Sequence, residues 1–418
     1  MTDPSTMISL DEAFARLDRV LDPRRPTSSG SGFAQFVPIR EARGLVLVDT
    51  PRSSLDLPPF DKSAMDGFAL LPDDPGQAAP AAFDPTEGPV YRVLELVAAG
   101  HQAQHTLQPG CAIKIMTGAQ VPAGTERVVK HEHTKERDGW VQIRRRDHRT
   151  NICLQGEDIQ QGQPLLEIGR RLSALDVANL VACGVQEVPV ARPVRIAILS
   201  TGDELVDHPR DLSSGRIMNT NGPLLAGLAA THGLDVVLEE TVPDSEQATV
   251  DALERALDAA DIVVLSGGVS AGDFDLVPHA LRGCGLELQF QQVAVKPGKP
   301  ITLASGPEGL VFGLPGNPVP VFLMFHLFVM RAVCAVTGQA DPLRRLTAPL
   351  AVDFQRRKAG RLEYVPARLH SDGSVERVPF HGSAHLMALA EADGFFTVPA
   401  GISGLAAGTP TPFLLLPS

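Results

Sequence analysis

The chain has 418 residues, 44% of them hydrophobic and 21% charged, which is enough for two to four globular domains. Its formal net charge of −12 argues against general binding to nucleic acid or to an anionic membrane, so an anionic substrate would need a local cluster of Lys and Arg. Five scattered cysteines without a C-x-x-C pair favour reduced thiols in the cytoplasm, and we expect neither a signal peptide nor a membrane span of ~20 apolar residues.

The first predicted elements are a capped helix and a β-rich region. Residues 9–12 (SLDE) have the pattern of a capping box, and apolar residues at helical spacing continue to Leu21. Short β-like runs separated by Pro and Gly then predict a mostly β structure for residues 33–148. A second helix is predicted to begin at a Ser173 cap and to end at Gly184.

The region after residue 193 alternates between predicted strands and helices. We expect strands at 194–199, 236–240 and 262–265, and helices at 221–232 and after a cap at Asp244. This βαβαβ rhythm predicts a mainly parallel sheet covered by helices, with ligands beyond the carboxyl ends of the strands. From about residue 340 the chain returns to short strands with Pro and Gly, which indicates a small β-barrel or sandwich.

Two polar turns follow predicted strands of the α/β region. Residues 200–204 (STGDE) stand where a catalytic carboxylate or a metal ligand would lie, although a turn with solvated acids is the alternative. Residues 266–268 (SGG) open a glycine-rich loop whose N–H groups could close on phosphate oxygens, but it is neither a Walker loop nor G-x-G-x-x-G. Asp273 and Asp275 could hold Mg²⁺ through oxygen ligands, or Asp275 could simply cap the next helix.

Two further turns contain proline. The turn at 295–300 (VKPGKP) places Lys296 and Lys299 close together, which costs electrostatic energy unless an anion bridges them; a solvated basic turn is the alternative. The turn at 314–318 (LPGNP) fixes the backbone at the start of an apolar helix, which is often structural but can also form an anion site. The lysine turn therefore favours an anionic ligand without identifying it, and the LPGNP turn is compatible with one.

Seven sequence blocks, taken in order, resemble one family. They are FDKSAMDGFA, IMTGAQVPAG, GEDI, STGDEL, LSGGVSAGDFD, VKPGKP and LPGNPV. Over nearly its whole length the chain resembles the molybdopterin molybdenumtransferases, which include the bacterial MoeA proteins and the matching domains of gephyrin and its plant counterpart. The resemblance implies a multidomain α+β and α/β protein, in which a MogA-like doubly wound α/β domain is joined to β-rich N-terminal domains and a C-terminal β-barrel.

The same resemblance implies domain boundaries and an assembly. The expected domains are a discontinuous linker and dimerisation domain of helices and short strands at 1–32 and 149–190, a β-rich second domain at 33–148, the α/β molybdopterin-binding domain at 191–338 and the C-terminal β-barrel at 339–418. An elongated homodimer is implied, with the active cleft between the α/β domain of one subunit and the β-rich second domain of its partner.

The implied chemistry is the use of adenylylated molybdopterin and molybdate, with Mg²⁺, to leave molybdenum on the dithiolene sulfurs. Matched position by position, the implied catalytic residues are Asp66, Thr117, Glu204, Asp244 and Asp275, with Mg²⁺ at Glu204, Asp244 and Asp275. The residues implied to bind substrate are Asp158, Ser200, Thr201, Gly202, Asn221, Ser266, Gly267, Gly268, Ser270, Lys296, Lys299, Pro315 and Pro318. Further implied partners are the pterin adenylyltransferase and the molybdenum enzymes that receive the cofactor.

Two segments depart from the family pattern. The family often has arginines before Gly-Glu-Asp, whereas this chain has residues 153–155 (CLQ); the arginines at 144–146 or Arg149 are candidates to supply the missing anion contact. In residues 218–221 (MNTN) the family commonly has Asp or Ser before the last Asn, a difference that we expect to be tolerated.

Two other functions remain open from the sequence. The pterin adenylyltransferase uses a similar α/β domain one step earlier, but it needs neither the N-terminal β region nor the C-terminal barrel. A non-catalytic scaffold is the other alternative, since gephyrin also anchors receptors. The acids and lysines of the motifs favour the enzyme, and the sequence does not distinguish molybdate from tungstate.

Overall fold

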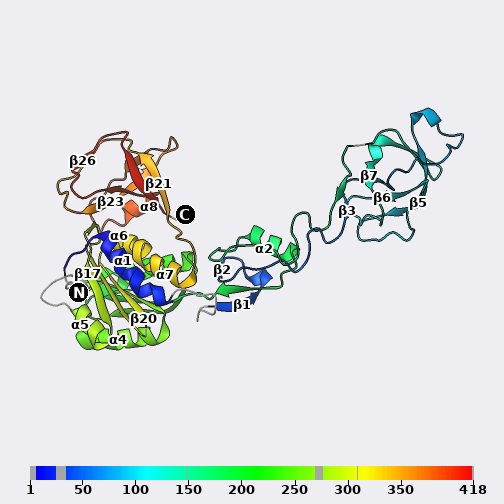
Figure 1. Ribbon diagram of the computed structural model, residues 1–418. Helices are drawn as coiled ribbons and strands as arrows, with labels where there is room; N and C mark the ends of the chain where they lie inside the picture. The colour runs from blue at the N-terminus through cyan, green and yellow to red at the C-terminus, as the bar shows by residue number, and fades with distance from the viewer. Residues whose placement is uncertain (1–5, 25–33, 147, 269–275, 308, 417–418) are drawn as a thin grey trace.

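The computed structural model describes residues 6–24, 34–146, 148–268, 276–307 and 309–416. The chain is elongated (Figure 1). An α/β unit and a C-terminal β unit lie together at one end, a small linker unit lies in the middle, and a β-rich distal unit lies at the other end. Two antiparallel segments of the chain connect the linker unit to the distal unit.

The α/β unit is built on a six-stranded sheet. Its strands, in spatial order, are β15 (Asp235–Val242), β12 (Arg195–Thr201), β16 (Ile262–Ser266), β20 (Gly309–Leu314), β19 (Pro300–Gly306) and β17 (Glu287–Gln292). The first four strands are parallel to one another, β19 runs antiparallel to β20, and β17 runs antiparallel to β19 and so returns to the direction of the first four. The predicted mainly parallel sheet is therefore confirmed.

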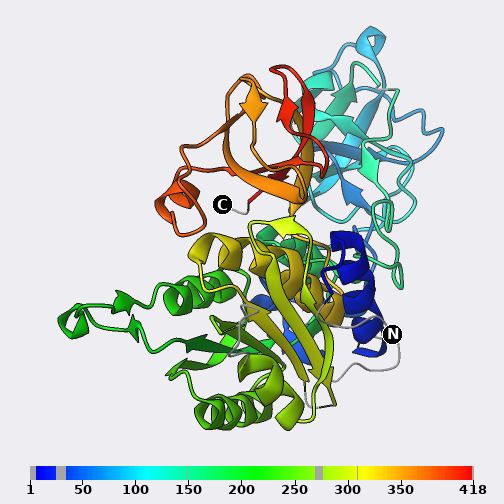
Figure 2. The ribbon, with the colours of Figure 1, turned by 90° about the vertical axis from the view of Figure 1, so that its left-hand side faces the viewer.

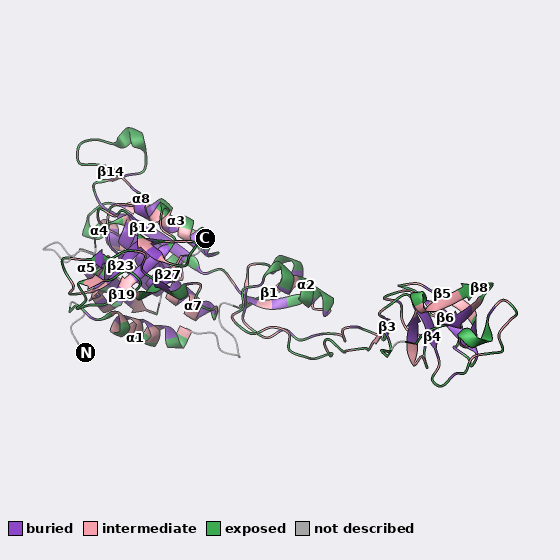
Figure 3. Cartoon of the chain, turned by 90° about the horizontal axis from the view of Figure 1, so that it is seen from above, coloured by how far each residue is buried: buried purple, intermediate pink, exposed green. Residues whose placement is uncertain are grey.

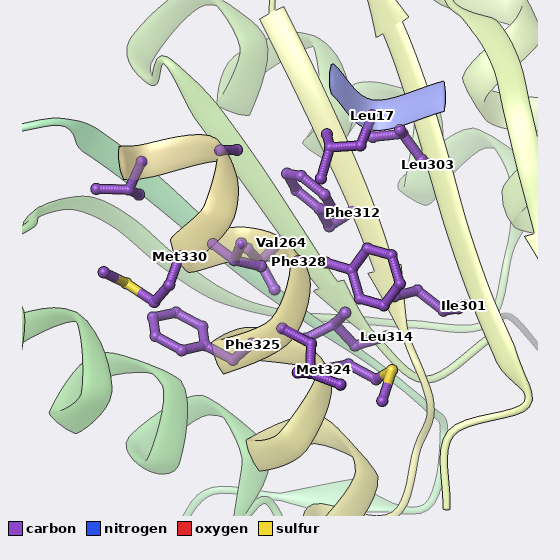
Figure 4. Packing of buried hydrophobic residues seen from close by; sticks show 14 of the residues in the cluster. Leu17, Val264, Ile301, Leu303, Phe312, Leu314, Met324, Phe325, Phe328 and Met330 are labelled. Carbon is purple, nitrogen blue, oxygen red and sulfur yellow. The ribbon is translucent and has the colours of Figure 1, made fainter. Parts of the chain in front are cut away.

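Helices cover both faces of this sheet, as expected for a doubly wound domain. One face carries α1 (Leu10–Leu21), α3 (Asn221–Thr231), α6 (Pro318–Met324), a π-helical turn at Phe325–Val329 and α7 (Met330–Thr337), and the other carries α4 (Glu246–Ala259) and α5 (Leu276–Gly283). Successive residues of β12 alternate between the two cores: Ile196 and Ile198 face the first, and Ala197 and Leu199 face the second. Figure 4 shows the first core, where Leu17 of α1 lies near Phe312 of β20.

The apolar helix predicted to follow the LPGNP turn is continuous from Pro318 to Thr337. By length and composition alone it could cross a membrane, but 83% of its most apolar window is buried inside the protein. Its apolar side chains, including Phe325 and Phe328, pack against the sheet. The length of this helix is therefore explained by its position in the core.

Helix α1 packs elsewhere than the expected domain boundaries placed it. Residues 1–32 were assigned to the linker domain, whereas α1 shares the core of the α/β unit. The Arg16 guanidinium donates to the Gln289 carbonyl at 2.9 Å, and Arg331 of α7 forms an ion pair with Asp18 at 2.6 Å. Ser9 caps the helix by accepting from the Glu12 amide, as predicted.

The linker unit includes a segment that we had assigned to the β-rich domain. Its three-stranded sheet consists of β1 (Ala34–Pro38), β11 (Glu187–Ala191) and β2 (Val46–Leu47), and α2 (Ala174–Ala182) packs on it. Residues 34–47 therefore belong with 165–191, because both contribute to one hydrophobic core. The predicted cap at Ser173 is confirmed, and it forms a full capping box with the buried Asp176.

The distal unit is mostly β, as predicted. Its six-stranded sheet has the order β7 (Arg127–Lys130), β4 (Gly67–Leu70), β6 (Cys111–Ile115), β5 (Val90–Val97), β9 (Trp140–Ile143) and β8 (Thr134–Arg137). The strap, defined here as residues 49–63 and 151–165, connects it to the linker unit through bridges Arg52↔Pro164 and Leu57↔Ile159 and the pair β3 (Lys62–Ser63)–β10 (Ile152–Cys153). In Figure 3 the buried residues gather within the units, and the strap is largely exposed or half-buried.

The C-terminal unit takes one strand from the lysine turn. Its main sheet has the order β18 (Val295–Lys296), β23 (Leu362–Leu369), β25 (Gly394–Val398), β27 (Pro410–Leu415) and β21 (Arg344–Pro349), and β24 (Val375–Arg377) also pairs with β23. The pair β22 (Phe354–Gln355)–β26 (Gly404–Leu405) and α8 (Met387–Ala390) complete the unit. Because β18 pairs with β23, the C-terminal unit contacts the α/β unit beside the lysine turn. Figure 2 shows the C-terminal unit lying directly against the α/β unit.

Candidate active site

The carboxyl ends of β12 and β16 bring two predicted motifs together. Ser200 and Thr201 at the end of β12 are buried, and so is Ser266 at the end of β16. The Thr201 hydroxyl donates to the Ser266 carbonyl at 3.4 Å, and the Ser266 hydroxyl lies 3.5 Å from that of Ser200. The turn at 200–204 and the loop that starts at 266 are therefore neighbours, as the parallel strands predicted.

Glycine is required where these two segments meet. Gly267 has φ +92° and Gly268 has φ +62°, a conformation that other residues rarely adopt. A Cβ at Gly267 would collide with the Thr201 carbonyl oxygen, and one at Gly268 would lie 2.9 Å from the Thr201 hydroxyl. The rest of the predicted loop, including Ser270 and Asp275, lies outside the described residues.

The LPGNP turn joins the same edge of the sheet. The Gly267 amide donates to the Leu314 carbonyl at 3.2 Å, and the Asn221 side-chain amide donates to the Gly316 carbonyl at 2.8 Å. Asn221 is buried, and its Oδ1 has no hydrogen-bond partner among the described residues. Pro315 is buried, and Pro318 is the first residue of α6, so both prolines occupy the rigid positions that the sequence indicated.

Three exposed acids lie at this edge. The amide of Asp203 donates to the Asp244 carboxylate at 3.3 Å, and the amide of Asp244 donates to the Asp203 carboxylate at 3.1 Å. The Glu204 carboxylate lies against Gly202, where a Cβ would be 2.6 Å from its Oε2. The prediction that Asp244 caps a helix is wrong: Ser245 caps α4, and the Asp244 amide bonds to the Asp203 turn instead.

The two lysines of the VKPGKP turn differ in their environments. Lys296 forms an ion pair with Glu363 of the C-terminal unit, with 2.6 Å between Nζ and Oε1. The sequence had suggested two ammonium groups in need of an anion, but Lys296 already faces a carboxylate. Lys299 is exposed and forms no ion pair within the described residues. It precedes β19, which runs antiparallel to β20, so it lies at the same edge as the LPGNP turn.

Asp66 and Thr117 are in direct contact. The Thr117 amide and hydroxyl both donate to Asp66 Oδ1 at 2.7 Å. These hydrogen bonds hold the pKa of the exposed Asp66 carboxyl below its usual range, with a smaller contribution from the charge of His131. The pair lies in the distal unit, at the far end of the chain from the edge of the α/β sheet (Figure 1).

The structure brings Asp158 to neither cluster. This residue lies on the strap, where its amide donates to the Leu57 carbonyl at 3.0 Å and its side chain is exposed. Of the arginines considered as substitutes for the missing anion contact, Arg144 pairs with Glu87 at 2.8 Å, and Arg146 donates to the Tyr91 hydroxyl at 3.1 Å. Both therefore have partners within the distal unit.

Two residues beside the site, Glu363 and Ser383, were not predicted from the sequence. The Asn317 side-chain amide donates to the Ser383 hydroxyl at 2.9 Å, and the Val319 amide donates to the Ser383 carbonyl at 3.2 Å. Both missed residues belong to the C-terminal unit and are more than 60 positions from their partners in sequence. The sequence analysis placed both residues in the C-terminal β region but gave no signal that either would lie beside the site.

Three family models match consecutive parts of the chain. They are described as the MoeA N-terminal region (domain I and II) at residues 8–184, a probable molybdopterin binding domain at 197–334 and the MoeA C-terminal region (domain IV) at 347–416. A molybdopterin molybdenumtransferase of Staphylococcus epidermidis is 33% identical over 88% of this chain and 88% of its own. The chain belongs to the molybdopterin molybdenumtransferase (MoeA) family.

Other members of the MoeA family agree in sequence and fold. The molybdopterin molybdenumtransferase of a Nostoc species is 33% identical over 92% of this chain and 89% of its own. The solved structure of a molybdopterin biosynthesis MoeA protein from Pyrococcus horikoshii is 26% identical, with a TM-score of 0.83, and covers 98% of this chain and 99% of its own. The multidomain fold expected from the resemblance is thus confirmed.

Proposed function

We propose that this MoeA-family transferase inserts molybdenum into molybdopterin, taking adenylylated molybdopterin and molybdate as substrates and releasing AMP. The observation that carries the proposal is the convergence of a glycine-rich loop, a lysine turn and exposed carboxylates at one edge of the α/β sheet. Main-chain N–H groups and ammonium groups suit the phosphate of the substrate and a tetrahedral oxyanion.

Each cluster has a separate role in the proposed reaction. The loop from Ser266 to Gly268, with Ser200, Thr201 and Gly202 beside it, binds the phosphate-bearing substrate, and Asn221 and the prolines of the LPGNP turn fix the backbone around it. Lys299 and Lys296 bind oxyanion charge and stabilise the negative charge that develops as the adenylate leaves. The proposed binding residues Asp158 and Ser270 are assigned from the family pattern alone.

The exposed carboxylates suit Mg²⁺, a hard cation that prefers oxygen ligands. Asp244 and Glu204 offer carboxylate oxygens, and Asp275 is a further candidate from the family pattern. No group of three or more His, Cys, Asp or Glu suited to a metal occurs among the described residues, so substrate phosphate and water would complete the coordination. When bound, Mg²⁺ would neutralise phosphate charge and lower the barrier to departure of the adenylate.

We infer a homodimer, because the two halves of the proposed site are far apart in one chain. Asp66 and Thr117 lie in the distal unit and Glu204 and Lys296 at the other end of the molecule (Figure 1), so the proposed catalytic pair would complete the site of a second subunit. Large apolar side chains are exposed on the linker unit, namely Phe36, Ile168, Leu175 and Val181. Such a surface suits contact with another copy of the chain.

The proposal is tested by incubating the purified chain with adenylylated molybdopterin, Mg²⁺ and molybdate. We expect release of one AMP for each molybdenum atom bound to the pterin, and tungstate in a parallel sample identifies the preferred oxyanion. Absence of AMP release with both oxyanions would refute the proposal. Adenylylation of molybdopterin with ATP would instead identify the chain as the adenylyltransferase, the rival that needs no distal unit.

A genetic test distinguishes the enzyme from a scaffold without catalysis. In a strain without this gene, loss of molybdenum-enzyme activity should be restored by the wild type but not by Glu204→Ala. We place the enzyme in the cytoplasm, where it would receive substrate from the pterin adenylyltransferase and pass the cofactor to molybdenum enzymes. Equal rescue by wild type and Glu204→Ala would favour the scaffold.

A further inference from the structure

The contact between Lys296 and Glu363 crosses from the α/β unit to the C-terminal unit. The two residues stand opposite each other in the parallel pair β18–β23, and Nζ and Oε1 are 2.6 Å apart. The Glu363 side chain is 11% exposed, whereas the Lys296 side chain is 46% exposed. A nearly buried carboxylate thus faces an ammonium group that remains open to solvent.

Glu363 is itself held in place by a buried cation. Arg356 lies 3.1 Å from its other carboxylate oxygen, and the Arg356 side chain is only 4% exposed. The guanidinium of Arg356 also donates to the carbonyls of Ile402, Arg361 and Pro399. Because Arg356 is hydrogen-bonded both to Glu363 and to main-chain carbonyls of the C-terminal unit, that unit fixes the position of the Glu363 carboxylate.

The pairing changes what Lys296 can offer to an anion. An ammonium group has three N–H donors, and one of them is used by Glu363, so two remain for a ligand. The Glu363 carboxylate is shared between Lys296 and Arg356, and its negative charge beside Lys296 reduces the positive potential that a bound anion experiences there. Lys299 has no ion pair within the described residues, so its charge in the turn is not reduced by a paired carboxylate.

We propose that Glu363 is a positioning and specificity-determining residue for the oxyanion at the lysine turn. The proposal rests on the proposed function, in which Lys296 and Lys299 bind a substrate oxyanion. Glu363 holds the Lys296 ammonium at the edge of the sheet, and its negative charge limits how much anionic charge the turn accepts. The turn therefore binds a tetrahedral oxyanion weakly enough to release it for reaction, and it disfavours ligands of higher charge.

The test measures oxyanion binding to the full chain by calorimetry. Glu363→Gln keeps an oxygen that can accept from Arg356 but removes the negative charge beside Lys296. We expect the affinity for molybdate, a dianion, to rise about tenfold and that for perrhenate, a monoanion of the same shape, to rise only about threefold, because Coulomb energy scales with ligand charge. The salt dependence of molybdate binding should also become steeper.

The control is Glu391→Gln, which breaks the exposed ion pair with Arg368 in the same unit and should leave both affinities unchanged. If Glu363→Gln binds molybdate as the wild type does, or more weakly, the assignment of Glu363 is wrong. Lys299→Ala tests the underlying proposed function separately, because Lys299 has no ion pair within the described residues: unchanged molybdate affinity in this variant would remove the anion role of the turn itself. Weaker molybdate binding by Lys299→Ala, together with unaltered binding by Glu363→Gln, would overturn only the role of Glu363.

Discussion

Two inactive variants should restore activity to each other if the active site is shared between subunits. Asp66→Asn removes the negative charge of the carboxylate that accepts hydrogen bonds from Thr117 in the distal unit. Glu204→Gln removes a carboxylate at the edge of the α/β sheet. Both side chains are exposed and each replacement keeps the size of the side chain, so each change should lower the free energy of unfolding by about 1 kcal/mol or less. Each variant alone is expected to be inactive, because every site of its homodimer has lost one group.

The activity expected of the mixture follows from the positions of Asp66 and Glu204 in the dimer. In a twofold dimer whose sites combine the distal unit of one chain with the α/β edge of the other, a mixed dimer has one site with both changes and one site with neither. Random assembly of equal amounts makes about half of the dimers mixed, so the mixture should reach about a quarter of wild-type activity per chain. Mixed dimers purified with two different tags should reach about half of the wild-type activity per chain.

The assay is AMP release from adenylylated molybdopterin after co-expression of the two variants. Pairs of variants from the same side of the site are the control: Asp66→Asn with Thr117→Val, and Glu204→Gln with Lys299→Ala, should show no rescue. If the active site lay within one chain, every site of a mixed dimer would still carry one change. Activity of the mixture no higher than that of its parents would therefore refute the shared site.

Three further predictions concern stability. Burial lowers the pKa of His326 to about 4, so its neutral form stabilises the fold fully above pH ~6.5. This stability should be lost as the pH falls towards 4, by at most ~1.4 kcal/mol per pH unit. Thermal unfolding at pH 7 and 5 should show a weaker pH dependence for His326→Gln than for the wild type. Gly267→Ala should lower the melting temperature and weaken phosphate binding, because its Cβ would collide with the Thr201 carbonyl. The control Gly215→Ala, also at positive φ but with nothing within 4 Å of a Cβ, should lower the free energy of unfolding by only about 1 kcal/mol. Equal effects of the two variants would contradict the steric argument. Asp176→Ala should destabilise the linker unit by about 1–2 kcal/mol in urea unfolding, since its carboxylate completes the capping box and pairs with Arg170.

Much of the α/β unit was predictable because its signals are local. The apolar run of β12 and the apolar face of α4 determine burial by themselves, and parallel strands bring their carboxyl ends to one edge. Neighbouring caps are harder to separate, as Asp244 and Ser245 show: both are good caps, and only the contact with the Asp203 turn decides which one is used.

Contacts between units could not be predicted in the same way. Glu363 meets Lys296 only because β18 leaves the α/β unit and pairs with β23, and no periodicity in the sequence encodes that pairing. The position of α1 is a similar case, since its apolar face would suit either the linker unit or the α/β unit. Asp66 and Thr117 were found through the family motifs, and their hydrogen bonds give a physical reason for the pairing.

The strap gives the distal unit a preferred direction of movement. Two antiparallel segments, bridged at Arg52↔Pro164 and Leu57↔Ile159, form a ribbon rather than a single tether. Bending such a ribbon within its plane would slide the strands past each other and shear the hydrogen bonds between them, whereas bending it out of plane leaves them nearly unchanged. The distal unit should therefore swing out of the plane of the ribbon more easily than within it, and Asp66 and Thr117 would move together because they lie in the same unit.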